Sequence, residues 1–288
     1  MKKLVVIDVG GTSIKYALWN QQAQELTNKS KVDTPRTLKN FYLKLEDIVA
    51  KFDGEELDGV SIAIPGAVNQ KTGVIGGISA LPYLHNFPIK SEIDKRLNLK
   101  VKMENDANSA ALAEMKSGAG KNFHNVIFFV IGTGVGGSIV LDRKIVHGTH
   151  LLGGEFGMTA SHHNKRLSHV ATLVHMAELY NEQYKKNLTG RQVLERAHKG
   201  DEGALRLVNL MYRNLASAIY NAQFSIDPEV IIIGGGVSAN PIFINDLNFA
   251  IRDLTNRIGQ VPMVPQVIAA KYHNDANLIG AAYNFYQD

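Results

Sequence analysis

The chain has 288 residues, enough for two domains or one large one, and 45% of its residues are hydrophobic, so a sizeable core can form. Its 31 basic and 27 acidic side chains give a net charge of +4 without a long run of one sign, which argues against a nucleic-acid partner. The absence of cysteine excludes disulfides, thiolate nucleophiles and cysteine-ligated zinc, and it suits a reducing cytoplasm.

Two apolar stretches resemble membrane segments at first sight. The run that follows the basic start is interrupted by Asp8, which makes it too short for a signal peptide. Residues 126–141 are uncharged, but they contain four glycines and fall short of the about 20 residues that span a bilayer. We therefore expect a soluble, cytoplasmic protein without a membrane partner.

The first predicted elements are a strand, a tight glycine turn and a second strand. Residues 4–9 are apolar apart from Asp8, and Gly10 and Gly11 follow. Residues 14–19 then alternate with period two and are rich in β-favouring side chains. A dinucleotide-binding fingerprint needs a helix after its glycines, so this sequence excludes that interpretation.

The same pattern returns roughly 120 residues downstream, the length of a typical domain, in residues 126–141. Two unrelated hairpins would also explain this echo. A third glycine run, 234–236, follows an apolar strand and precedes a helix that Asn240 or Ser238 could cap. Backbone N–H groups in such turns bind anions, and glycine lets a ligand approach closely. The three turns together therefore favour a phosphate ligand.

The remaining sequence predicts a mixed α/β chain. Strand-rich openings followed by helices occur twice, which supports two related α/β halves with a cleft between them. Besides the two hairpins, at 4–9 with 14–19 and at 125–131 with 136–141, the predicted strands are 24–32, 58–64, 100–104, 230–234 and 266–269. The predicted helices are 38–51, 91–97, 106–117, 168–184, 190–198, 201–225, 241–257 and 275–286.

Asn105 and Asp106 lie where the predicted strand 100–104 meets the predicted helix 106–117. Asn and Asp are among the best N-cap residues, so helix capping is one interpretation. The other is that Asp106 accepts the proton of a hydroxyl that attacks a phosphoryl group. The two interpretations are compatible, because either residue could cap the helix while Asp106 faces the cleft.

Five motifs occur in an order that indicates a family. They are D-x-G-G-T-x-x-K at 8–15, ENDAN at 104–108, GTGVGG at 132–137, GGEFG at 153–157 and IIIGGGVS at 231–238. With these spacings the chain resembles, over essentially its whole length, the ROK family of bacterial sugar kinases, repressors and uncharacterised open reading frames. The resemblance implies the two-domain ribonuclease H-like (actin-like ATPase) fold, with a small domain of residues 1–117 plus 275–288 and a large domain of residues 118–274.

The resemblance also implies ATP and Mg²⁺ as cofactors, bound in the interdomain cleft. The first glycine turn would bind the β- and γ-phosphates, the second would face it from the other domain, and the third would lie by the adenosine. Asp8 would lie near Mg²⁺ and bind it through water, although a turn-stabilising role is the alternative. The implied ATP-binding residues are Asp8, Gly10, Gly11, Thr12, Lys15, Gly132, Thr133, Gly134, Gly235 and Gly236.

For the sugar, the resemblance implies that Asp106 is the catalytic base and that Asn105, Glu155 and Gly66 bind the substrate. Carboxylates suit this task because they accept two hydroxyl hydrogen bonds in a fixed fork. A further sugar-binding patch of the family has decayed to YLHNF at 83–87, where Tyr83 or His85 could contribute instead.

Many members of the family bind zinc through a histidine and three cysteines. Met158 takes the place of that histidine, and the chain has no cysteine, so we expect no zinc site. A site made of histidines alone is the alternative to ordinary loop and helix-surface histidines. The candidates are His162, His163, His169 and His175. The chain thus resembles the zinc-free subgroup, which includes β-glucoside kinases and fructokinase-like proteins.

The leading hypothesis is an ATP-dependent sugar kinase that phosphorylates O6 of a hexose or hexose-containing glycoside, such as glucose, N-acetylmannosamine or a β-glucoside. The first alternative is a ROK-type sugar-sensing regulator, whose own DNA-binding domain has no room before a first strand at Leu4. The second is a generic actin-like ATPase, against which the ENDAN and GGEFG motifs argue. A homodimer is expected, because dimers are common in the family.

Overall fold

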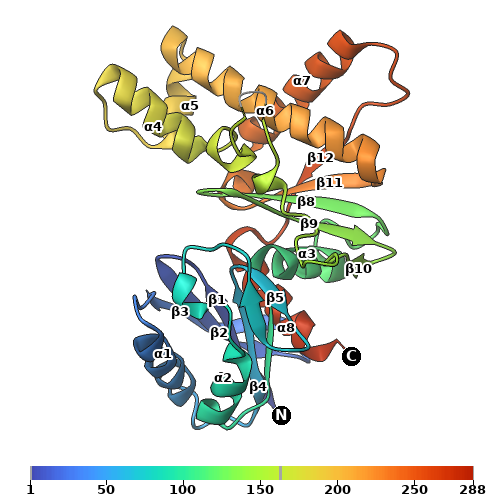
Figure 1. Cartoon of the computed structure of the whole chain (residues 1–288). Helices are drawn as coiled ribbons and strands as arrows, with labels where there is room; N and C mark the ends of the chain where they lie inside the picture. The colour runs from blue at the N-terminus through green and yellow to red at the C-terminus, as the bar shows by residue number, and fades with distance from the viewer. Residues whose placement is uncertain (1, 162–163, 288) are drawn as a thin grey trace. The chain divides into compact units, whose positions relative to one another are not determined.

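The structure is a computed structural model of the whole chain and describes residues 2–161 and 164–287 (Figure 1). The chain forms two compact units. Unit 1 consists of Met1–Lys121, His147–Gly153 and Asn274–Asp288, and unit 2 of Asn122–Val146 and Gly154–His273. The predicted domains, 1–117 plus 275–288 and 118–274, differ from these units at a few boundary residues and at His147–Gly153, which no sequence pattern assigned to the first unit.

Unit 1 contains a five-stranded sheet with the order β3-β2-β1-β4-β7. The strands β1 (Lys3–Val9), β2 (Ser13–Asn20) and β3 (Glu25–Asp33) are antiparallel, and β4 (Leu57–Ile64) and β7 (Val101–Asn105) run parallel to β1. A short hairpin, β5 (Ala67–Asn69) and β6 (Val74–Gly76), follows β4. Its strands have three residues each, too few for an alternating pattern to be recognised in the sequence.

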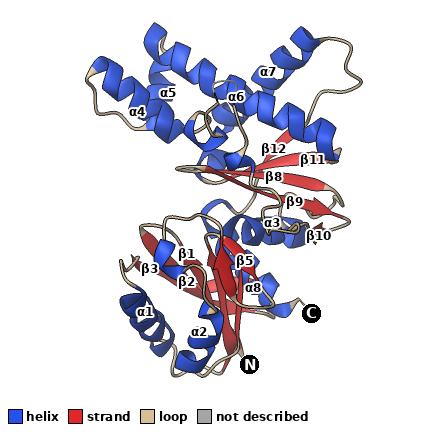
Figure 2. Cartoon of the chain, viewed as in Figure 1, coloured by secondary structure: helices blue, strands red, loops and turns tan. Residues whose placement is uncertain are grey.

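Helices cover both faces of this sheet (Figure 2). Val5 and Ile7 of β1 share a core with α1 (Leu38–Ala50) and α2 (Ile89–Leu97). Successive strand residues point to opposite faces, so Asp8 faces away from Val5 and Ile7. On that other face, Asn277 of α8 (Ala276–Tyr286) donates a hydrogen bond to Asp8. The helix α3 (Asp106–Ser117) packs closely on α8, because Gly280 lets the backbone at Ser109 approach; a Cβ at Gly280 would lie 1.6 Å from the Ser109 carbonyl oxygen.

Unit 2 repeats the plan of a hairpin followed by parallel strands. Its sheet has the order β10-β9-β8-β11-β12. The strands are β8 (Val126–Ile131), β9 (Val135–Leu141), β10 (Lys144–Ile145), β11 (Val230–Gly234) and β12 (Val267–Ala269). The helices α4 (Leu173–Tyr184), α5 (Gly190–His198), α6 (Glu202–Ile226) and α7 (Pro241–Ile258) contribute to one apolar core with this sheet.

The mixed α/β prediction is confirmed, and most predicted element bounds lie within two residues of those observed. The predicted helix 168–184 is wrong in its first turn, because α4 begins at Leu173, where the Thr172 hydroxyl accepts a hydrogen bond from the His175 N–H at 3.2 Å. Tertiary contacts explain the difference: the Ser168 hydroxyl accepts a bond from the Val135 N–H at 3.0 Å, which holds Ser168 against β9. Among residues 2–161 and 164–287, no helix has the length and apolar character of a membrane span.

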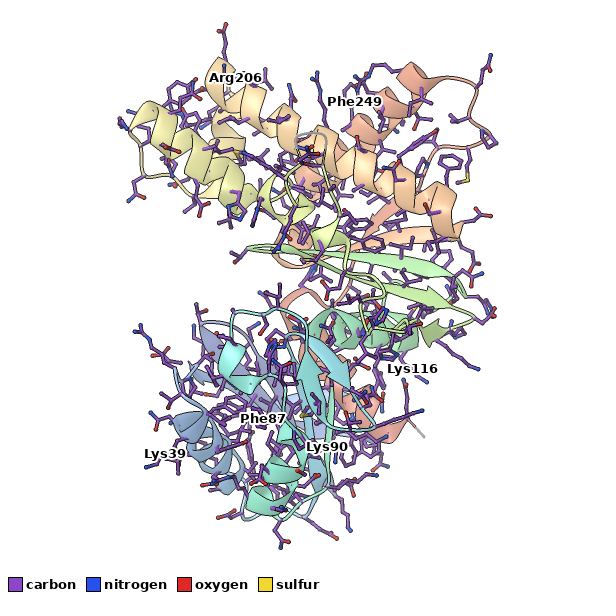
Figure 3. The ribbon with its side chains drawn as sticks, viewed as in Figure 1. Lys39, Phe87, Lys90, Lys116, Arg206 and Phe249 are labelled. Atoms are coloured by element: carbon purple, nitrogen blue, oxygen red, sulfur yellow. The ribbon has the colours of Figure 1, made fainter. Side chains whose placement is uncertain are left out.

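The surfaces of the helices are largely polar. In Figure 3, Lys39 and Lys116 project from α1 and α3 of unit 1, and Arg206 and Phe249 project from α6 and α7 of unit 2. Several large apolar side chains are also exposed on the helices, and Phe249, at 68%, is the most exposed of those described.

Candidate functional site

In unit 1, the predicted site residues gather at one edge of the sheet. Asp8 pairs with Ala63 in parallel register, and Ile64 pairs with Asn105. The carboxyl ends of parallel strands meet at the same edge, which is where ligands bind in open α/β sheets. The first glycine turn, Gly66 and the β7–α3 junction are therefore neighbours, although they are far apart in the sequence.

The turn between β1 and β2 is held in a defined shape. The Gly10 N–H donates to the Ser13 carbonyl at 3.0 Å. Thr34 fastens the turn from the end of β3: its N–H donates to the Thr12 carbonyl at 3.0 Å, and its hydroxyl donates to the Gly10 carbonyl at 2.6 Å. Gly11 and Thr12 are exposed at the tip. The result is a braced, exposed loop of the kind that binds phosphates.

Asp8 lies directly before this turn and is 6% exposed. It pairs with Lys15 across β1 and β2, and the Lys15 ammonium lies 3.3 Å from Asp8 Oδ2. Asn277 donates to Asp8 Oδ1 at 2.9 Å. Each carboxylate oxygen keeps a further lone pair. This donor set fits a hydrated Mg²⁺, which retains several of its waters in most protein sites.

The β7–α3 junction decides between the two possible caps. Asn105 caps α3, because its Oδ1 accepts a bond from the Asn108 N–H at 3.1 Å. Asp106 is the first residue of the helix, and its Oδ1 accepts from the Ala107 N–H at 2.8 Å. A negative charge is favoured in the first turn of a helix. Capping therefore does not depend on the Asp106 carboxylate, which is half-buried.

Gly66 supports this junction from the end of β4. Its carbonyl accepts a bond from Asn105 Nδ2 at 3.0 Å. Its φ of +108° lies in the region that favours glycine, and a Cβ would lie 2.7 Å from Ile75 Cγ2. His85 of the decayed patch lies beside Gly66, with Cε1 3.3 Å from where that Cβ would be, whereas the Tyr83 hydroxyl bonds the Pro35 carbonyl.

In unit 2, the turn between β8 and β9 is closed by a bond from the Gly132 N–H to the Gly134 carbonyl at 2.9 Å. Gly132 and Thr133 are exposed. A Cβ added at Gly132 would meet no atom within 4 Å. Packing therefore does not require glycine at position 132, and the space beside it is open to a ligand.

The third glycine turn contains two glycines with different roles. Gly235 has φ +79°, and a Cβ there would lie 2.2 Å from the Ile131 carbonyl oxygen, so the fold requires this glycine. A Cβ at Gly236 would meet nothing within 4 Å. Asn240 caps α7 by accepting the Ile242 N–H at 3.0 Å, and Ser238 instead donates to the Gly235 carbonyl at 2.8 Å.

Gly236 lines a cavity of about 370 Å³, together with the start of α7 and one side of α5. This volume is in the range of small-molecule sites, which begins at about 300 Å³. Arg191 and Glu195 of α5 provide its charged side chains, with His198 at its rim. Sequence reasoning missed these α5 residues, because their spacing is that of an ordinary polar helix face.

The loop that carries Glu155 lies directly on β9. A Cβ at Gly154 would lie 2.7 Å from Ser138 Cα, and a Cβ at Gly157 would lie 1.9 Å from the Val135 carbonyl oxygen. Between them, the Phe156 ring stacks on Phe129 with centroids 4.4 Å apart. The glycines therefore hold Glu155 at a fixed height above the strand, and burial raises the pKa of its carboxyl group.

A larger cavity of about 720 Å³ lies elsewhere in unit 2, between α6, the end of α7 and residues 156–161. Among the described residues, its lining contains none of the predicted site residues and no charged side chain. Phosphate oxygens are bound most strongly by charged donors such as Arg and Lys. We therefore do not place the nucleotide in this cavity.

Of the four histidines considered for zinc, the structure describes His169 and His175. The rings of His169 and His175 are 5.4 Å apart, and His175 Nδ1 lies 2.6 Å from a Glu178 carboxylate oxygen. His162 and His163 lie outside the described residues. Among the described residues, no three His, Cys, Asp or Glu side chains form a group that could hold a metal ion. Met158 is 48% exposed in the short 3-10 helix Phe156–Met158. The absence of zinc stays a prediction.

Comparison with known proteins places these features in a family. The model of the ROK family matches residues 4–287. A β-glucoside kinase from Listeria innocua is 28% identical over 99% of this chain and 98% of its own. Among solved structures, a ROK family protein from Streptococcus pneumoniae in complex with sucrose is 34% identical, with a TM-score of 0.87 over 98% of this chain and 97% of its own.

A ROK family glucokinase from Streptomyces griseus, solved with glucose and AMPPNP, is 26% identical, with a TM-score of 0.82 over 97% of this chain and 98% of its own. These neighbours confirm the predicted actin-like ATPase fold class. The glycine turns, the Asn105–Asp106 junction and the loop of Glu155 therefore occur in a chain that belongs to the ROK family.

Proposed function

We propose that this chain transfers the γ-phosphoryl group of ATP to O6 of a hexose unit and that its preferred acceptor is a β-glucoside. The chain is an ATP-dependent carbohydrate kinase, the class to which its kinase relatives belong.

The observation that carries the proposal is that Asn105, and not Asp106, caps α3 at the β7–α3 junction. Asn105 caps the helix at 3.1 Å from the Asn108 nitrogen, so the half-buried Asp106 carboxylate at the first helical position can serve as general base. In phosphoryl transfer, such a base accepts the proton of the attacking hydroxyl while other groups hold the phosphate in line. Asn105 retains a second amide hydrogen for a sugar hydroxyl after bonding Gly66.

The glycine turns supply the phosphate sites of the proposal. Gly10, Gly11 and Thr12 would hold the β- and γ-phosphates, with Lys15 as a nearby cation, and Gly132, Thr133 and Gly134 would contact phosphate from unit 2. Mg²⁺, when bound, neutralises phosphate charge, and Asp8 would hold its waters. The cavity beside Gly236 would take the nucleoside, because Gly236 leaves open space and Gly235 is required by the fold.

Glu155 and its surroundings favour a glycoside as the acceptor. Glu155 would bind two sugar hydroxyls from a loop held rigidly on β9. The exposed Met158, three residues further on, presents an apolar surface that suits an aglycone better than a hydroxyl. A β-glucoside kinase among the relatives and a sucrose complex among the structures support an acceptor larger than one hexose.

A coupled assay of ADP formation tests the proposal with glucose, fructose, mannose, N-acetylmannosamine, cellobiose and aryl β-glucosides. We expect the highest kcat/KM with a β-glucoside and very little ADP without sugar. A sugar-sensing regulator would bind a sugar in calorimetry yet form no ADP. A generic ATPase would form ADP at its full rate without sugar.

The expected homodimer is also a proposal. Phe249 offers one apolar contact on the surface of α7 (Figure 3). Light scattering of the purified chain measures the mass directly, and a mass of about one chain at micromolar concentration would contradict the dimer.

A further inference from the structure

Glu104, the residue before Asn105, is a carboxylate with 1% exposure. One of its oxygens, Oε1, accepts a bond from the Asn105 N–H at 2.7 Å and another from Asn108 Nδ2 at 3.2 Å. Asn105 and Asn108 lie on either side of Asp106 in the first turn of α3. The Glu104 carboxylate therefore braces the turn that carries the proposed base.

The other oxygen, Oε2, binds two elements from elsewhere in the chain. Gln70, in the turn between β5 and β6, donates to it through Nε2. His147 Nε2 lies 2.9 Å from the same oxygen. Four donors thus converge on one buried carboxylate. Burying a carboxylate without partners would be strongly unfavourable, and these four partners satisfy the hydrogen-bonding capacity of Glu104.

His147 begins the segment His147–Gly153, which belongs to unit 1 although the chain on both sides of it belongs to unit 2. The Gly153 N–H donates to the His147 carbonyl at 2.9 Å, so the segment forms a closed loop. The chain then continues through Gly154 to Glu155. The bond between His147 and Glu104 therefore also holds Gly153, from which only Gly154 separates Glu155.

A purely structural role would not need these groups. Apolar residues of similar volume stabilise a core as well as a buried ion pair does, or better. The Glu104–His147 pair instead connects β7, where Asp106 follows two residues after Glu104, with the segment His147–Gly153, whose end lies two residues before Glu155. Precise placement of both is what phosphoryl transfer demands, since an error of 1 Å can reduce the rate about 10²-fold.

We propose that Glu104 and His147 are positioning residues of the kinase reaction, in which Glu104 orients the turn that carries Asp106 and His147 ties the segment leading to Glu155 to the same carboxylate. This inference rests on the proposed function. It predicts different kinetic signatures for the two residues. Loss of the Glu104 contacts should lower kcat, and loss of the His147 contact should raise the KM for sugar while the KM for ATP stays the same.

The test uses His147→Ala, with His150→Ala as its matched control, because His150 is an exposed histidine of the same segment. We expect His147→Ala to raise the sugar KM about 10-fold or more, and His150→Ala to match the wild type. His147→Gln should recover part of the loss, because its amide can donate to Glu104. Wild-type sugar KM in His147→Ala, with only a lower melting temperature, would overturn the role of His147.

Glu104→Gln tests the proposed role of Glu104 without changing the size of the side chain. We expect kcat to fall between about 10- and 100-fold, the range that a small misplacement of the base produces. A folded Glu104→Gln variant with wild-type kcat would overturn the role of Glu104.

If Glu104→Gln does not fold, the histidine variants decide the proposal. If the wild type and His150→Ala phosphorylate no sugar, the proposed function fails; if both are active and His147→Ala is equally active, only this inference fails.

Discussion

The side chain of Asn105 joins two elements of unit 1: its Nδ2 donates to the Gly66 carbonyl at 3.0 Å, and its Oδ1 accepts from the Asn108 N–H at 3.1 Å. The first bond holds the end of β4, and the second begins α3. The position of Asp106 therefore depends on a neighbour that has a structural task of its own.

Asn105→Ala should destabilise the protein. It removes the cap of α3, a loss of typically about 1 kcal/mol in the free energy of unfolding. It also leaves the Gly66 carbonyl without this donor. Urea denaturation measures the change. An unchanged free energy of unfolding would mean that Asn105 is not the cap that the structure shows.

Gly235→Ala and Gly236→Ala form a matched pair in the third glycine turn. Gly235→Ala should destabilise or unfold the protein, because it places a Cβ 2.2 Å from the Ile131 carbonyl oxygen at a φ of +79°. Gly236→Ala should keep the wild-type melting temperature, because its Cβ meets no atom, yet weaken ATP binding. Calorimetry with a non-hydrolysable ATP analogue measures this. Unchanged nucleotide affinity in Gly236→Ala would place the nucleoside elsewhere.

Glu155→Gln should weaken sugar binding without lowering the stability of the protein. Burial raises the pKa of Glu155 above its ordinary value of 4.5, so the native state disfavours the charged form. The free energy of unfolding therefore falls as pH rises from the unfolded-state pKa of Glu155 to its folded-state pKa. It stays at this lower value at neutral pH, where the carboxylate is charged in both states. Glu155→Gln should consequently melt at the same temperature as the wild type or higher at pH 7.5.

The same variant should bind sugar more weakly at pH 7.5, because its amide accepts at one oxygen only. In the wild type, sugar affinity should decline as pH falls through the raised pKa of Glu155. Sugar titrations at several pH values, for the wild type and for Glu155→Gln, test both points. If sugar affinity were equal in the two proteins while ATP affinity fell, Glu155 would belong to the nucleotide site.

His147 should also make stability fall as pH rises, in a range that begins at the ordinary histidine pKa of 6.5. The hydrogen bond to Glu104 raises the pKa of His147 above its ordinary value of 6.5. A raised histidine pKa contributes stability that is fully present below the unfolded-state pKa and is lost as pH rises through the folded-state pKa. The difference in melting temperature between the wild type and His147→Gln should therefore shrink as pH rises above neutrality. His150→Gln serves as control, and a difference that stays constant with pH would contradict the charged pair.

Much of this molecule could be predicted from its sequence, because the information is local. Residues 14–19 alternate with period two, and the apolar strands 4–9 and 125–131 each end at a glycine turn, so the bounds of both hairpins follow from the sequence. The glycine motifs likewise marked the turns that carry most of the candidate site. The residues of β5, β6 and β10 were missed because strands of two or three residues carry no period.

The contacts that were missed are those that depend on tertiary structure. Glu104 and His147 are 43 positions apart, and neither belongs to a pattern that predicts their pairing. Ser168 was predicted as the first residue of the helix 168–184, and its hydrogen bond to β9 depends on tertiary packing. Arg191 and Glu195 reach the cavity beside Gly236 only because α5 packs there. Such positions become visible when the chain is folded.

The most direct test of the account is the kcat of Asp106→Asn with the best sugar substrate. Because Asn105 is the cap, this substitution should change the free energy of unfolding by well under the ~1 kcal/mol that losing a cap costs. Sugar and ATP should still bind with similar affinity. An amide cannot accept the hydroxyl proton, and a positioned base contributes about 10²–10⁴-fold, so kcat should fall by at least about 100-fold. A folded Asp106→Asn variant that retains more than about a tenth of the wild-type kcat would contradict Asp106 as the catalytic base.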